Sequence, residues 1–226
     1  MPLGKDKKDM LVHPWDTATD DAEWQRWLAA GHDFGQLVAA GRERIVPAVV
    51  PSHFHYDGGD LVLLHLARPN PVWAAIEENP TVLLSVVDDY AYIPTTWRAT
   101  DPAAVKHGVP TSYYSAVQLT ATASIVDDPE GKARILGVQL AALQPEGDFG
   151  PVAPGEGPYG RLLSAVRGLE LRITAVTAKF KYDDHKSVDF RKGIADRLES
   201  RSAERDAGAR RQQLRRIRER GDWRPA

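Results

Sequence analysis

The stretch from Leu61 to Trp73 constrains the fold of this chain more than any other. It begins with an apolar run that contains a single histidine, meets two prolines, and resumes as a short apolar segment. The apolar run predicts a buried strand, and the prolines end it because proline cannot donate to a sheet ladder. Residues 72–78 then predict a helix. A strand that meets a helix start leaves N–H groups unpaired at one point, and Arg68 beside them favours a bound phosphate or carboxylate.

The rest of the chain predicts more strands, several helices and one long irregular segment. Expected strands cover residues 34–40, 45–56, 81–87 with a continuation at 90–94, 113–126 and 169–180. Expected helices cover residues 19–30, 127–143, 159–166, and a segment from about 186 that continues to 220. The turn Asp57-Gly-Gly predicts a hairpin into the strand at Leu61, and antiparallel hairpins close most simply into a small barrel. Residues 96–111 are irregular, which is typical of a lid or an interface segment.

Composition excludes several kinds of site and of protein. The chain has 226 residues, 42% of them hydrophobic, which is enough for a full core. It has no cysteine, so disulfides, thiolate metal sites and cysteine nucleophiles are excluded, and any iron must be held by histidine, tyrosine, carboxylate or methionine. No apolar run approaches the roughly 20 residues that span a bilayer, so we expect a cytoplasmic protein. The usual glycine-rich nucleotide loops and the G-x-S-x-G elbow of serine hydrolases do not occur.

Three groups of polar residues on expected strands are candidates for binding or chemistry. His53 and His55, two apart on one strand, would share a face, as a metal pair or the wall of a polar pocket requires, although an exposed strand end is the simpler explanation. Lys179 and Lys181 would form a cationic face for phosphate or propionate groups, or lie solvated at an edge. The tyrosines of the strands are either ligand contacts or packing residues. They are Tyr90, Tyr92, Tyr113 and Tyr114.

The C-terminal segment is strongly basic. Residues 197–220 contain nine arginines against four carboxylates, while the whole chain has a formal charge of −2. Because apolar residues are sparse there, we expect a mainly solvated helix that docks on the acidic remainder, contacts a second subunit or touches nucleic acid. The interleaved glutamates make nucleic-acid binding the weakest of these interpretations.

Several motifs in a fixed order resemble one family. They are His65-Leu-Ala-Arg-Pro-Asn-Pro-Val-Trp73, Ala91-Tyr-Ile-Pro94 followed by Trp97, Val109-Pro-Thr111, and Gly168-Leu-Glu-Leu-Arg-Ile173 with Lys179-Phe-Lys181. Together they resemble the PaiB-type proteins, known as FMN-binding negative transcriptional regulators, over residues 34–198. The resemblance implies an α+β fold: a mainly antiparallel split β-barrel with peripheral helices and a long C-terminal helix. It further implies a homodimer with the cofactor at the interface.

Two departures from the family pattern shift the expected cofactor. The usual Trp-Asn-Tyr after Val-Pro-Thr is Ser112-Tyr-Tyr114 here, and the usual Leu-Ser-Gln-Asn after Lys-Phe-Lys is Tyr182-Asp-Asp-His185. One branch that resembles this family, the piperazate synthases, uses haem b instead of FMN and closes δ-N-hydroxyornithine into piperazic acid. A similar activity here would take an amino-acid substrate.

The resemblance to that branch assigns roles to named residues. It implies that His65 is the metal ligand and that Arg68 and Lys181 neutralise the haem propionates or the substrate carboxylate. The remaining expected cofactor contacts are Asn70, Trp73 and His53. Candidates for the proton donor or for substrate positioning are Tyr92, Tyr113, His55 and Lys179. The expected organisation is an N-terminal arm (1–18), a cofactor-binding split-barrel domain (19–198) and a basic C-terminal helix or tail (199–226).

Overall fold

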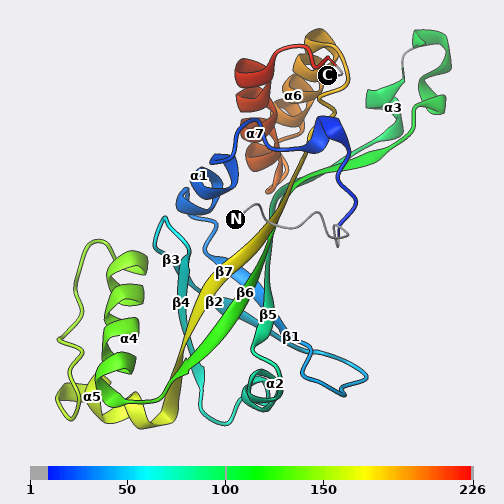
Figure 1. Cartoon of the computed structure of the whole chain (residues 1–226). Helices are drawn as coiled ribbons and strands as arrows, with labels where there is room; N and C mark the ends of the chain where they lie inside the picture. The colour runs from blue at the N-terminus through cyan, green and yellow to red at the C-terminus, as the bar shows by residue number, and fades with distance from the viewer. Residues whose placement is uncertain (1–9, 100, 225–226) are drawn as a thin grey trace. The chain divides into compact units, whose positions relative to one another are not determined.

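A computed structural model describes residues 10–99 and 101–224 of the chain. Seven strands form one sheet in the order β2-β1-β5-β6-β7-β4-β3 (Figure 1). The strands are β1 (Phe34–Ala39), β2 (Ala48–His53), β3 (His55–Tyr56), β4 (Leu61–Ala67), β5 (Thr81–Ile93), β6 (Thr111–Val126) and β7 (Val166–Lys181). The helices are α1 (Glu23–Ala29), α2 (Val72–Glu78), α3 (Thr95–Arg98), α4 (Pro129–Leu143), α5 (Gly157–Leu162), α6 (Val188–Arg201) and α7 (Asp206–Arg220), with short 3-10 turns η1 (Pro14–Asp16), η2 (Pro102–His107) and η3 (Leu163–Ala165). The predicted α+β class with an antiparallel sheet is confirmed.

The described chain divides into two compact units. Unit 1 contains residues 25–86 and 118–176, and unit 2 contains residues 10–24, 87–117 and 177–224. The long strands β5, β6 and β7 each contribute residues to both units. None of the helices in the described part of the chain is long and apolar enough to cross a bilayer.

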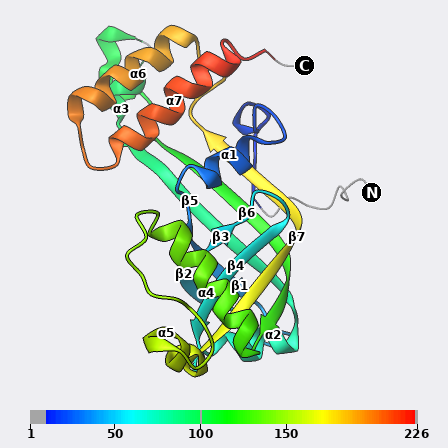
Figure 2. The same cartoon turned by 90° about the vertical axis from the view of Figure 1, so that its left-hand side faces the viewer.

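Unit 1 is built around the hairpin and strand that the sequence predicts at Asp57 and Leu61. β3 pairs with β4 across the Asp57–Asp60 turn, and β4 pairs along its whole length with β7. α4 packs against β4 and lies along the sheet (Figure 2). Both faces of β4 are apolar. On the face toward α4, Ile135 lies against Gly168, while Val62, Leu64, Leu169 and Leu171 lie fully buried on the opposite face.

Unit 2 combines aromatic residues with buried charges. α6 and α7 pack side by side (Figure 1). Their buried faces contain Ile194, Leu198 and Ala209, but also Arg191 and Arg216, both 0% exposed. Of the nine arginines in the segment predicted as mainly solvated, Arg216 alone is fully buried, with Asp184 and Glu23 as partners, and the others are exposed or half-buried.

Two expected elements differ from the structure. The single helix from 186 to 220 is two helices, because Ser202 adopts a left-handed conformation at the end of α6 (φ 49°) and Asp206 accepts from the Ala203 N–H. The single strand from 45 to 56 is broken at Phe54, whose side chain is buried and whose N–H donates to Asp33. The break separates β2, which pairs with β1, from β3, which pairs with β4.

Candidate functional site

His65 lies near the end of β4, half-buried, opposite Gly168 of β7. Its Nδ1 is 2.7 Å from Oε1 of Gln139, a buried residue of α4. The other end of the same amide, Nε2, donates to the main-chain carbonyl of His53 at 3.2 Å. All of these residues belong to unit 1.

These two contacts determine which imidazole nitrogen carries the proton. The carbonyl of His53 only accepts, so the amide must turn its NH₂ toward it and its oxygen toward His65. An amide oxygen also only accepts, so Nδ1 of His65 must be the protonated nitrogen. The lone pair then lies on Nε2, the tautomer that a metal-ligating histidine needs, with the other nitrogen held by a fixed partner.

The sequence analysis did not identify Gln139 as part of this site. Gln139 follows Ile135 by four residues, so both side chains face the same way on α4, toward the interior. A glutamine on the buried face of a helix indicates a polar partner in the core, but the sequence does not say which one.

The strand-to-helix junction after His65 uses its polar groups internally. Oδ1 of Asn70 accepts from the Val72 N–H at 3.0 Å, and the Trp73 indole donates to the Ala67 carbonyl at 2.9 Å. Arg68 binds both carboxylate oxygens of Asp127 and the carbonyl of Ser164. The hydrogen bonds from Arg68 lower the pKa of the Asp127 carboxyl, and the same bonds raise the pKa of Arg68. Cofactor binding by Arg68 would have to replace these contacts.

The two histidines predicted as a pair lie on different strands. His53 ends β2 with an exposed side chain 3.5 Å from Asp33, while His55 begins β3 and pairs with Leu63. The premise that both occupy one strand face is wrong because Phe54 interrupts the strand. Among the described residues, neither belongs to a cluster of three metal-ligating side chains.

The two lysines of β7 do lie together, within unit 2. Nζ of Lys179 is 5.6 Å and Nζ of Lys181 is 5.7 Å from the centre of the Tyr114 ring. Lys181 also donates to Thr111 and Ser112, and burial lowers its pKa. Lys179 donates to the Leu11 carbonyl and approaches Asp16, where burial raises the carboxyl pKa. Lys179 is buried and Lys181 is half-buried beside Tyr114, and anion binding by this pair stays a prediction.

The two candidate tyrosines have contrasting environments. Tyr113 is 0% exposed, donates to Asp183 at 3.0 Å and accepts from Gln213, and burial raises its pKa. Tyr92 is 58% exposed on β5. Tyr113 is thus a buried hydrogen-bonding residue of unit 2, and Tyr92 is open to solvent.

Comparison with known proteins identifies the family. Residues 10–175 match the family described as “Putative FMN-binding domain”. The fold is similar to the flavocytochrome Anf3 from Azotobacter vinelandii, with 19% identity, a TM-score of 0.56, and 74% of this chain and 70% of that chain covered. It is also similar to an FAD and haem binding protein from Mycobacterium smegmatis, with 15% identity, a TM-score of 0.54, and 73% and 72% covered. No match to a curated protein was found.

Proposed function

The chain belongs to this family of FMN-binding domains, and from that premise we propose that it is a haem-dependent cyclase of the piperazate-synthase type. In the proposed reaction the α-amine of δ-N-hydroxyornithine attacks the hydroxylated nitrogen. The N–N bond forms, the N–O bond breaks, and the hydroxyl group leaves as water after it takes up a proton. The reaction needs no external oxidant or reductant, since its products are one ring and one water.

The observation that carries the proposal is the hydrogen-bonded state of His65. Its Nδ1 proton is held by Gln139, so Nε2 is available as an iron ligand. The chain contains no cysteine, which leaves histidine as the leading axial ligand. Two solved structures of the same fold are described as a flavocytochrome and as an FAD and haem binding protein, so this fold accommodates haem in other proteins.

The chain's own residues would hold the cofactor and move the proton. Haem iron, when bound, would act as a Lewis acid that weakens the N–O bond. His65 would ligate it, and Arg68 of the same unit would neutralise a carboxylate of the cofactor or substrate in place of Asp127. Among the candidate proton donors, Tyr113 and Lys179 already donate to Asp183 and Leu11, and His55 belongs to the same unit as His65, so His55 is favoured.

Spectroscopy tests the ligand assignment directly. Haem-reconstituted protein is expected to show a Soret band, and His65→Ala is expected to lose the spectrum of the axially ligated iron. His107→Ala is the matched control, because it removes an exposed histidine that is not among the expected cofactor contacts. A His65→Ala variant with an unchanged ligated spectrum would contradict the assignment.

The reaction is tested by incubating the haem-loaded protein with δ-N-hydroxyornithine. Cyclised product in the presence of wild-type protein, and its loss in His65→Ala, are the expected results. Ligated haem without any product would leave the cofactor proposal standing and reject the substrate.

The alternative is an FMN-binding flavoprotein or regulator of the PaiB type, which the family description favours. Protein that purifies with yellow flavin absorption and no Soret band would support it. A DNA-binding role for the arginines has less support, because several are paired with carboxylates. Such a role requires salt-dependent binding to duplex DNA.

We also propose a homodimer with the cofactor at its interface, as the family resemblance implies. Light scattering of the purified protein tests the oligomeric state. Loss of haem on dilution to the monomer would support an interfacial cofactor.

A further inference from the structure

Unit 2 contains a cavity that is separate from the residues assigned above. It has a volume of about 240 Å³ and lies between the segment 98–109 and the start of α6. At about 30 Å³ for each water molecule, this volume holds roughly eight waters, or one small organic molecule. Its lining consists of Arg98, Ala99, Asp101, Ala104, His107, Gly108, Val109, Lys186 and Phe190.

Two basic side chains of the cavity, near the carboxylate of Asp101, have no carboxylate partner of their own within the described chain. Arg98 is bound to Asp183, and Asp101 accepts from the Ala103 N–H at the start of η2. Lys186 and His107 have no carboxylate partner among the residues that the structure describes. An ammonium group and an imidazole therefore remain free to donate hydrogen bonds to a ligand.

Three arginines hold the segment around the cavity in place. Arg98 donates to the Val109 carbonyl, and Arg197 donates to the Trp97 carbonyl at 2.8 Å. The guanidinium of Arg201 lies 4.7 Å from the centre of the Trp97 ring. Gly108 packs so closely on the backbone of α3 that any Cβ atom there would overlap Thr95. The cavity is thus formed before a ligand arrives, which lowers the entropic cost of binding.

From these observations we infer that the cavity is a binding site for a small organic oxyanion. The ligand carries a carboxylate or phosphate group, which Lys186 and His107 bind, and a short apolar part, which contacts Phe190 and Val109. This ligand is distinct from any cofactor bound at His65, and its binding does not depend on the proposed reaction.

Calorimetric titration of the full-length protein tests this inference, with inorganic phosphate and glutarate as probes and sodium chloride at equal ionic strength as the blank. Saturable binding of one molecule per chain is expected for at least one probe. Tighter binding of glutarate identifies a carboxylate ligand, and tighter binding of phosphate identifies a phosphate ligand. Binding of neither probe above the blank overturns the inference.

Variants locate the binding to this cavity. Lys186→Met keeps the aliphatic stem and removes the charge, so it is expected to weaken binding about fivefold, as for a charge-assisted hydrogen bond at a half-exposed position. Lys192→Met is the matched control, since Lys192 lies exposed on α6, the helix that follows Lys186, and does not line the cavity. Equal weakening in both variants overturns the site. His107→Gln provides a second test, and His65→Ala is expected to bind the probe unchanged whether or not it binds haem.

Discussion

The two units of this protein have cores of opposite character. Around β4 and α4, unit 1 buries aliphatic side chains, and Gln139 is one of its few buried polar groups. Unit 2 buries Arg216 against Asp184 and Glu23, and Arg191 against Asp184. The difference teaches that one chain can build one core from aliphatic side chains and another around charges that must stay paired.

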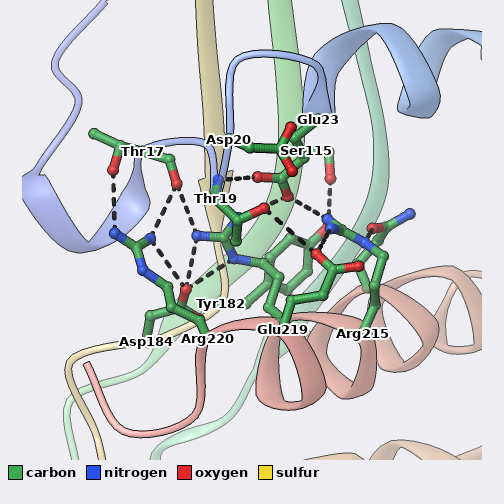
Figure 3. A network of polar contacts seen from close by, with 12 residues as sticks. Thr17, Thr19, Asp20, Glu23, Ser115, Tyr182, Asp184, Arg215, Glu219 and Arg220 are labelled. Carbon is green, nitrogen blue, oxygen red and sulfur yellow. Dashed lines mark hydrogen bonds and ion pairs between the residues drawn. The ribbon is translucent and has the colours of Figure 1, made fainter.

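The Arg216 network also ties distant segments of unit 2 together. Arg216 and Arg220 of α7 both donate to the main-chain carbonyl of Thr17, and Arg215 pairs with Glu23 and Glu219 (Figure 3). Arg216 and Arg220 therefore bind both carboxylates and backbone carbonyls, whereas Arg215 bonds to side chains. Removing one of them leaves buried acceptors with fewer donors.

The largest expected effect comes from Arg216→Met. The change leaves Asp184 and Glu23 with less compensating charge in the interior, so it should destabilise unit 2 by about 3–5 kcal/mol. Hydrogen exchange of the α7 amides, compared with those of β4, measures whether the loss is confined to unit 2. The control is Arg218→Met, which removes an exposed arginine of the same helix. Equal losses in the two variants would contradict the assigned role of the network.

A core substitution that leaves an empty space in unit 1 should reduce stability somewhat less than Arg216→Met does. Leu64 is 0% exposed on β4, and Leu64→Ala should cost about 3 kcal/mol through lost burial and the space left behind. The loss should appear in exchange of β4 and β7 amides, which pair with each other. Thr174→Ala, at an exposed position of β7, serves as the comparison. If the α7 amides lost their protection from hydrogen exchange before those of β4 and β7, the stabilities of the two cores would not be independent.

Removing a single buried hydroxyl in unit 2 should cost less again. Tyr182 is 0% exposed, donates to the Asp89 carbonyl at 2.9 Å and is bonded to the Ser115 hydroxyl. Tyr182→Phe keeps the ring and leaves both partners unsatisfied, so about 1–2 kcal/mol of stability should be lost. Denaturant unfolding measures the change. Retained wild-type stability would mean that water replaces the hydroxyl.

The smallest effect is a partial loss of unit 2 stability in mild acid. Burial favours neutral Glu23, but Arg216 and Arg215 outweigh it and lower its pKa, and Arg201 lowers the pKa of Asp206. A carboxyl whose pKa is lower in the folded state than in the unfolded state stabilises the fold at any pH above its unfolded-state pKa. This stability is lost as the pH falls through its folded-state pKa. The loss should therefore begin below about pH 4.5 for Glu23 and lower for Asp206.

Asp16 acts in the opposite direction. Because burial raises the pKa of its carboxyl, protonation of Asp16 as the pH falls stabilises the folded state. The carboxylates of unit 1 whose pKa is lowered, Asp127 and Glu78, are solvent-exposed and contribute little. Acid titration followed by hydrogen exchange should therefore show α7 losing protection before β4. The reverse order would contradict the contrast between the two units.

Local patterns in the sequence predicted most helices and strands. The predicted bounds were most accurate where an apolar pattern ends at a helix- or strand-breaking residue such as proline. The helix at 72–78 has the predicted bounds, and the strand that begins at Leu61 ends within the stretch interrupted by the prolines. The break at Phe54 was missed because no glycine or proline stands between Ser52 and Tyr56, and only the pairing of β2 with β1 and β3 with β4 separates the two segments.

The site was less predictable than the fold for a related reason. His65 and its position on a buried strand are local features of the sequence. Gln139, which determines its protonated nitrogen, lies 74 residues away. Similarly, the carboxylate of Glu23 that compensates Arg216 lies 193 residues away, and arginine in a charged segment normally indicates a solvated helix.

The sequence alone determined the α+β class, the strand-to-helix junction, the absence of thiolate chemistry and the family. Only the tertiary structure decided which arginines are buried, where the C-terminal helix divides and which nitrogen of His65 is free. The physical reason is that periodicity reports which face of a segment is apolar, whereas the energy of a buried polar group depends on partners that only folding brings within hydrogen-bonding distance.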